Sequence, residues 1–293
     1  MSHTPVLLKE VIKYLKPQPG QNFIDCTLGA GGHAKAILEK TGPDGKLLGI
    51  DMDHDALDLA EHNLAQFKNR IILHQGSFAD LEHIIEEHKF KPIHGILLDL
   101  GMSSMQIQGK RGFSFNRDDK LDMRFSLSAR TTAQEIINKW PEKKLAEIFK
   151  NYADEESYKQ IAKAIAEQRQ EEPIATTKQL ASLIVRAKLH SRFRSRKTHL
   201  HPATKIFQAL RIAVNQEIDN LIKVLPQGLI ALERGGKLVA ISFHSGEDRI
   251  VKNFFRYSDN LEILTKKLVI PGSSEIKNNP RSRSAKLRVA QKT

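Results

Sequence analysis

Apolar and polar positions over the first hundred residues follow a pattern in which short apolar runs alternate with amphipathic segments. Strands are expected at residues 22–26, 46–51, 70–75 and 94–99. Helices are expected between and after them, at residues 34–40, 53–67 and 81–87. Strands that alternate with helices at this spacing predict a parallel, doubly wound α/β sheet.

After residue 101 the alternation stops. A loop at 101–106 and an irregular, aromatic and basic stretch at 111–125 precede a series of amphipathic segments. These predict helices near residues 132–139, 142–151, 155–169 and 177–187. The sheet pattern then resumes with a long helix over 201–225, a strand at 235–243, a helix at 250–256, and closing strands at 261–264 and 287–290. We therefore expect a discontinuous sheet domain, residues 1–105 and 201–293, with an all-helical domain of residues 106–200 inserted in it.

A glycine-rich turn, Gly29-Ala30-Gly31-Gly32-His33, separates the first strand from the first helix of the sheet. Glycine lets a backbone approach a ligand closely, and the helix that follows directs unpaired N–H groups toward the turn. Asp51 ends the second strand twenty residues after Gly31, where an acid can accept hydrogen bonds from ribose hydroxyls. The pattern predicts a nucleoside-cofactor site. It also fits the dinucleotide fingerprint, so a nicotinamide-dependent dehydrogenase stays open as an alternative.

Four side chains lie at or just after the carboxyl ends of predicted strands: Asp25, Asp51, Phe78 and Asp99. Ligands of doubly wound sheets bind at these ends, so the four are expected to line one crevice. The flat ring of Phe78 suits stacking on adenine, although an anchor in the core is an equally good interpretation. Asp99 caps a strongly apolar run, and a buried acid there needs a partner or a ligand.

The charge distribution indicates a polyanionic partner. The chain has 46 Lys and Arg residues against 34 Asp and Glu residues, a net charge of +12. No acid occurs between Glu172 and Glu217, or from Arg281 to Lys292. Two basic blocks without acids favour nucleic acid as the partner. A methyl donor acting on a polyanion therefore fits better than a hydride acceptor acting on a small metabolite.

Cysteine and histidine usage predicts neither disulfides nor a metal site. Cys26, the only cysteine, lies within the first predicted strand, which indicates a reducing compartment. No signal pattern and no apolar run of about 20 residues occurs, so a cytoplasmic protein is expected. His190, His199 and His201 have no carboxylate nearby in sequence, which favours core or RNA-facing histidines over metal ligands.

Several motifs, in order along nearly the whole chain, resemble the MraW family of bacterial ribosomal RNA small-subunit methyltransferases. They are Gly29–His33, Asp99-Leu100-Gly101 with Ser103-Ser104 and Gln106, Arg111–Phe115, Leu121–Arg124, His201–Thr204, Phe207–Ile212, Ile241–Ser245 and Asn279–Arg288. The resemblance implies a Rossmann-like methyltransferase domain with an inserted helical domain. It also implies transfer of a methyl group from S-adenosylmethionine to N4 of a cytidine in the decoding region of 16S rRNA.

The resemblance further implies which residues contact the cofactor: Gly31, Gly32, His33, Asp51, Phe78, Asp99 and Gln106. His33 and Gln106 rest on the resemblance alone. The cytosine amine is a poor nucleophile, and an acceptor beside its N–H stabilises the developing charge. The candidates for this role are Asp99 or the backbone carbonyls after it, with Ser242 and His244 behind them. Candidate phosphate contacts are Arg111, Arg124, Arg194, Arg196, Arg281 and Arg283. The expected partner is the small ribosomal subunit. An RNA-binding assembly factor that keeps the fold without activity stays open.

Overall fold

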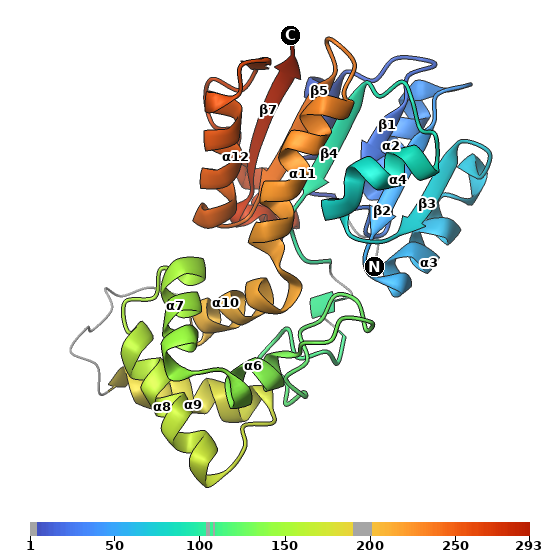
Figure 1. The fold of residues 1–293 in the computed structure, drawn as a ribbon. Coiled ribbons are helices and arrows are strands. Elements are labelled where there is room, and N and C mark those ends of the chain that lie inside the picture. Colours follow the sequence, from blue (N-terminus) through green and yellow to red (C-terminus); the bar gives the residue numbers. More distant parts are fainter. Residues whose placement is uncertain (1–4, 104–105, 108, 190–200) are drawn as a thin grey trace. The chain divides into compact units, whose positions relative to one another are not determined.

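The computed structural model describes residues 5–103, 106–107, 109–189 and 201–293 (Figure 1). The chain divides into two compact units: Met1–Ser103 with Ile218–Thr293, and Ser104–Glu217. Helix α10, Thr204–Asn215, lies in the second unit, where it packs against α6 and α7. The sequence pattern assigned this segment to the sheet domain. The second unit therefore extends beyond the expected insertion of residues 106–200.

The first unit contains a seven-stranded sheet in the order β3-β2-β1-β4-β5-β7-β6. All seven predicted strands are confirmed: β1 Phe23–Asp25, β2 Leu47–Asp51, β3 Ile71–Gln75, β4 Gly95–Asp99, β5 Lys237–Ser242, β6 Leu261–Ile263 and β7 Lys286–Lys292. β1 to β5 are parallel, whereas β7 runs antiparallel to both β5 and β6. The sheet is thus mixed at one edge and not parallel throughout.

Strand order reverses between β1 and β4. From β1 the chain adds β2 and β3 on one side, and then β4 and β5 on the other. The backbone N–H of Asp99, at the end of β4, donates to Oγ1 of Thr27, just after β1, at 2.7 Å. Such a reversal is where doubly wound sheets bind their ligands, at the carboxyl ends of the strands.

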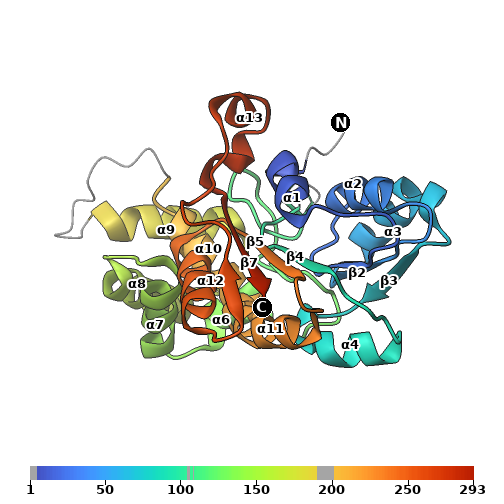
Figure 2. The same ribbon diagram turned by 90° about the horizontal axis from the view of Figure 1, so that it is seen from above.

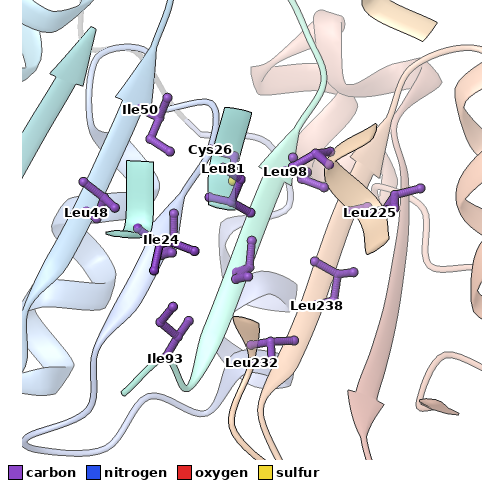
Figure 3. Packing of buried hydrophobic residues seen from close by; sticks show 14 of the residues in the cluster. Ile24, Cys26, Leu48, Ile50, Leu81, Ile93, Leu98, Leu225, Leu232 and Leu238 are labelled. Atoms are coloured by element: carbon purple, nitrogen blue, oxygen red, sulfur yellow. The ribbon is translucent and has the colours of Figure 1, made fainter. Parts of the chain in front are cut away.

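Apolar side chains alternate along the central strands and fill a core on each face of the sheet. Ile24, Ile96 and Leu238 point to one face, where α4 Leu81–Glu87, α11 Glu217–Ala231 and α12 Ser245–Tyr257 cover them (Figure 3). Phe23, Leu97 and Val239 point to the other face, covered by α1 Leu8–Leu15, α2 Gly32–Thr41 and α3 His54–Asn63 (Figure 2). Burial on both faces explains why these strands read as nearly continuous apolar runs.

Two helices replace the single long helix that was expected over residues 201–225. α10 ends at Asn215, and α11 begins at Glu217. Gln216 between them has a φ of 52°, in the left-handed region. The side-chain amide of Asn215 donates to the carbonyl oxygen of Met123 at 2.8 Å, and its side-chain oxygen accepts from the N–H of Phe125 at 2.8 Å. These bonds to a distant segment hold the end of α10, and periodicity within the helix does not predict them.

The second unit is helical, as expected. Besides α10 it contains α6 Ala133–Lys139, α7 Glu142–Ala153, α8 Tyr158–Glu171 and α9 Thr177–Leu189. A capping box of Thr132 and Glu135 starts α6. The first unit also has a short helix that was not predicted, α13 Ser273–Asn278, and 3₁₀ turns at Ala65–Phe67, Phe78–Asp80 and Pro280–Ser284. Among the described residues, every helix is too short or too polar to cross a lipid bilayer.

Candidate functional site

The glycine turn between β1 and α2 has the backbone conformation that its sequence predicts. Gly29 has a φ of 52° and Gly31 a φ of 79°, both in the left-handed region. A Cβ on Gly31 would lie 2.6 Å from Cδ1 of Leu64, and a Cβ on Gly32 would collide with Pro5. No side chain caps the first turn of α2 at its N-cap, Gly31. The N–H of Gly31 donates to the carbonyl oxygen of Leu28 at 2.9 Å, so the N–H groups that the turn can offer to a ligand are those that follow it in the first turn of α2.

We expect Gly31→Ala to destabilise the protein more than Gly20→Ala. Both glycines have a φ of 79°, but a Cβ on Gly20 has no atom within 4 Å. Each variant loses roughly 1–2 kcal/mol from left-handed backbone, and crowding at Leu64 adds about 1–3 kcal/mol for Gly31→Ala only. Urea unfolding at pH 7.5 measures both free energies. Equal losses would show that the turn can absorb a methyl group at residue 31.

Asp51 connects the end of β2 to the glycine turn. Its Oδ2 accepts from the N–H of Gly29 at 2.8 Å, and its Oδ1 accepts from the N–H of Asp53 at 2.9 Å. Each carboxylate oxygen can accept a second hydrogen bond. Burial raises the pKa of the Asp51 carboxyl, although the two N–H donors oppose this shift. The acid is thus oriented at the turn with capacity left for two hydroxyl groups.

Asp25, His33 and Asp99 form a buried polar cluster beside the turn, at the reversal of strand order. Nε2 of His33, on the first turn of α2, lies 3.5 Å from Oδ2 of Asp99. Both ring nitrogens of His33 and Oδ1 of Asp99 are buried and have no hydrogen-bond partner among the described residues. An unsatisfied buried polar atom costs about 1–3 kcal/mol, so several together indicate a binding site for a polar ligand.

Asp25 is the most buried acid of this cluster. It is 1% exposed, and its Oδ1 accepts from the N–H of Thr27 at 3.1 Å. Burial raises the pKa of its carboxyl to about 6; His33 and the N–H of Thr27 oppose the shift, while Asp99 and Asp51 add to it. The sequence placed Asp25 in the crevice but gave it no role. The charge state of Asp25 depends on how deeply its carboxyl is buried. The apolar pattern of the strand does not reveal that burial.

We expect Asp25→Asn to stabilise the protein at pH 8 and to do so less at pH 5. The folded pKa of about 6 lies above the ordinary value of 3.8, so the folded state favours the protonated form. Stability is therefore lost as pH rises from about 4 to about 6. By linkage the loss is on the order of 3 kcal/mol at pH 8 and about half of that at pH 5. Urea unfolding of both proteins at the two pH values tests this, with Asp58→Asn on the surface of α3 as control. A stability difference that does not change with pH would contradict it.

Phe78, Ser242 and His244 also lie at the carboxyl ends of strands, and each makes contacts within the fold. Phe78 is half-buried and packs against the core under α4. The hydroxyl of Ser242 donates to the carbonyl oxygen of Lys286 in β7 at 3.4 Å. Nδ1 of His244 accepts from the N–H of Glu247 at 3.3 Å and so caps α12. Their cofactor and catalytic roles stay predictions, alongside these structural ones.

Glu247 is a site-edge residue that the sequence pattern missed. It is 2% exposed. Its Oε2 accepts from the N–H of Phe243 at 2.8 Å and from the N–H of His244 at 3.3 Å, which completes a capping box at the start of α12. The spacing of a capping residue and a glutamate three positions later signals such a box, but histidine is not among the usual capping residues.

The candidate phosphate contacts divide into two groups. Arg111 donates to the carbonyl oxygen of Phe125 at 2.8 Å, and Arg124 pairs with Asp122 at 2.8 Å and donates to the carbonyl oxygen of Ala129 at 2.7 Å. These two guanidinium groups therefore hold the irregular segment together. Arg281 and Arg283, in the 3₁₀ turn before β7, are exposed.

The remaining predicted residues belong to the second unit or fall outside the described residues. Gln106 is buried within the second unit, and its cofactor contact stays a prediction. Arg194, Arg196, His190 and His199 fall outside the described residues. His201 is described and exposed.

One histidine pair was not singled out from the sequence. Nδ1 of His74, in β3, lies 3.0 Å from Nε2 of His88, after α4, with Glu87 adjacent. Burial lowers the pKa of His74, which favours its neutral ring. An N–H of one imidazole can donate to an unprotonated nitrogen of the other, which accounts for the short distance.

Comparison with known proteins gives matches along the whole chain. The family described as the MraW methylase family matches residues 1–293. The ribosomal RNA small subunit methyltransferase H of Thermotoga neapolitana is 46% identical over 99% of this chain and 95% of its own. The proteins of the same name from Persephonella marina and Syntrophotalea carbinolica are each 44% identical, over 100% and 99% of this chain and 99% and 98% of their own.

Proposed function

Because this chain belongs to the MraW methylase family, we propose that it transfers the methyl group of S-adenosylmethionine to the exocyclic N4 of a cytidine in the decoding region of 16S rRNA. The observation that carries the proposal is the group of acids at the reversal of strand order. Asp51 is hydrogen-bonded to the glycine turn, and Asp99 has a buried oxygen without a partner among the described residues. Relatives that match over nearly their whole length support the same activity.

The residues of the first unit fit a nucleoside cofactor. The turn at Gly31 and Gly32 brings the first N–H groups of α2 to the cofactor, whereas the N–H of Gly31 itself donates to the carbonyl oxygen of Leu28 at 2.9 Å. The carboxylate of Asp51 accepts from the ribose hydroxyls. Phe78 offers a ring face to adenine. His33 and Asp99 meet the polar end of the cofactor with atoms that are otherwise unsatisfied. When bound, S-adenosylmethionine supplies a methyl group already activated by its sulfonium.

The reaction then depends on positioning and electrostatics. The lone pair of the cytosine amine is delocalised into the ring, so the amine must lose part of that conjugation to attack. A carboxylate oxygen of Asp99 would accept a hydrogen bond from the amine N–H and stabilise the positive charge that develops on nitrogen. The methyl–sulfonium bond breaks as the N–CH₃ bond forms, S-adenosylhomocysteine leaves, and the methylated amine gives up one proton to Asp99 or to water. Asp99 is partly exposed, but its Oδ1 is buried, and partial burial strengthens this interaction because water screens it less. No covalent intermediate with the protein is required.

The nicotinamide alternative and the assembly-factor alternative make different predictions. A dehydrogenase would bind NADH in preference to S-adenosylmethionine, which isothermal titration of both ligands distinguishes. An inactive assembly factor would bind RNA without transferring a methyl group. Membership of a methylase family favours methyl transfer over both.

The test is methyl transfer to isolated small ribosomal subunits from cells that lack this enzyme. Radiolabelled S-adenosylmethionine is supplied, and the labelled nucleoside is identified after digestion of the RNA. We expect label in N4-methylcytidine at one position. Label in another nucleoside would overturn the proposal. So would the absence of label when the protein is folded and binds the cofactor.

A further inference from the structure

A surface cavity lies entirely within the second unit. The face of α9, the irregular segment before α6 and the start of α10 border an open, shallow cavity of about 440 Å³. Its lining combines Phe115 and His201 with Lys178, Ser182 and Arg186. The volume is in the range of sites for small organic ligands. Aromatic rings, a hydroxyl and two cations are the groups that bind a base and its phosphates.

The aromatic side of the cavity is a preformed stack. The rings of Phe115 and His201 are parallel within 26°, with centroids 4.5 Å apart. Phe115 also meets the buried ring of Phe207 edge to face at 5.1 Å. Nδ1 of His201 accepts from the N–H of Ala203 at 3.2 Å, which fixes the orientation of the imidazole. The exposed ring of His201 thus rests on the half-buried ring of Phe115, which packs against the buried ring of Phe207, and it can stack a base at little cost in side-chain entropy.

The opposite side of the cavity is a row of polar residues on α9. Lys178, Ser182 and Arg186 are spaced by four residues, so they share one face of the helix over about 12 Å. All three are exposed, and no salt bridge joins either cation to another described residue. Two acids lie near this row: Oδ1 of Asp118 accepts from the backbone N–H of Lys178 at 3.4 Å, and Glu172 lines an adjoining hollow with Lys178 and Arg186. The two cations are therefore available to an external anion.

We propose that this cavity is a subsite for one unpaired nucleotide of the RNA substrate, whose base stacks on His201 and whose flanking phosphates contact Lys178 and Arg186. The identity of the polyanion as RNA rests on the proposed function. An unpaired nucleotide fits better than a duplex, because bases within a helix have no free face to stack on a side chain. The guanidinium groups of Arg111 and Arg124, by contrast, make hydrogen bonds within the fold, and their phosphate contacts stay predictions.

The test measures binding of short RNA to the full-length protein. Single-stranded oligonucleotides carry 2-aminopurine, whose fluorescence falls on stacking, and anisotropy gives the affinity at several salt concentrations. We expect Lys178→Glu/Arg186→Glu to weaken binding at least about tenfold and to reduce the salt slope by about 1.4, for two phosphate contacts with a single strand. We expect His201→Ala to weaken binding about 5- to 150-fold and to remove the quenching. His201→Tyr is expected to restore both the binding and the quenching.

The control is Lys143→Glu/Lys163→Glu, which makes the same charge change at exposed positions of α7 and α8. It is expected to leave quenching unchanged and to weaken binding much less. Binding of S-adenosylmethionine, measured for each variant, shows that the first unit is intact.

The outcomes separate this subsite from the proposed function. Wild-type protein that binds no RNA but binds the cofactor would count against both. Wild-type RNA binding that is equally strong in the two pocket variants, or equal affinity for duplex RNA without quenching, would overturn the subsite alone. Tight binding of free adenosine monophosphate that depends on the same residues would also overturn it, since the cavity would then serve a free nucleotide.

Discussion

Asp99→Asn is expected to lower kcat for methyl transfer by about 10²- to 10⁴-fold, the usual contribution of a group that assists proton transfer or stabilises charge at the reacting centre. The variant keeps the volume of the side chain and the N–H···Oγ1 bond of the backbone to Thr27. It removes the negative charge and exchanges one acceptor oxygen for a donor. Asp99→Ala should be at least as slow. RNA affinity should be largely retained, because the substitution slows the methyl-transfer step and does not remove a contact needed for RNA binding.

Steady-state kinetics alone do not show whether the loss of rate arises in the chemical step or in cofactor binding, since Asp99 is also a candidate cofactor contact. Calorimetry therefore measures the Kd for S-adenosylmethionine in each variant, and single-turnover rates are taken at saturating cofactor. Asp58→Asn serves as the control: Asp58 is an exposed acid of α3 that pairs with His54 at 3.0 Å. Turnover of Asp99→Ala within a factor of two of wild type at saturating cofactor would exclude Asp99 as the acceptor for the amine.

The sheet could be predicted because its signal is local. Ile24 and Phe23 are neighbours that point to opposite cores, so strands buried on both faces appear as short apolar runs. The rule for strand ends then places Asp25, Asp51 and Asp99 on one edge without further information. The orientation of Asp51 toward the turn follows as well, since Gly29 and Asp51 belong to one βαβ unit.

The parts that the sequence did not reveal depend on contacts between distant segments. Arg111 and Arg124 occur in a basic stretch and read as phosphate contacts, yet their guanidinium groups bond to carbonyl oxygens and to Asp122. The break between α10 and α11 depends on Asn215, which bonds to residues about ninety positions earlier. Charge patterns indicate that a partner is anionic. They do not distinguish an arginine that is free from one already satisfied within the fold.

Asp51→Ala is expected to weaken binding of S-adenosylmethionine by about 10- to 150-fold, the equivalent of the 1.5–3 kcal/mol of a hydrogen bond to a charged group. Two effects contribute to this loss. The ribose hydroxyls lose their acceptor, and the N–H of Gly29 loses the carboxylate that orients the turn. Asp51→Asn keeps one acceptor oxygen and should lie between wild type and Asp51→Ala.

A double-mutant cycle separates these effects. S-adenosylhomocysteine and its 2′-deoxy analogue are titrated into wild type and Asp51→Ala by calorimetry. If Asp51 contacts the hydroxyl, removing that hydroxyl weakens binding to wild type and has little effect on the variant. If removal weakens binding equally in both proteins, Asp51 acts on the cofactor only through the turn. In that case Gly31→Ala, which disturbs the turn but keeps the acid, should reproduce most of the loss in affinity.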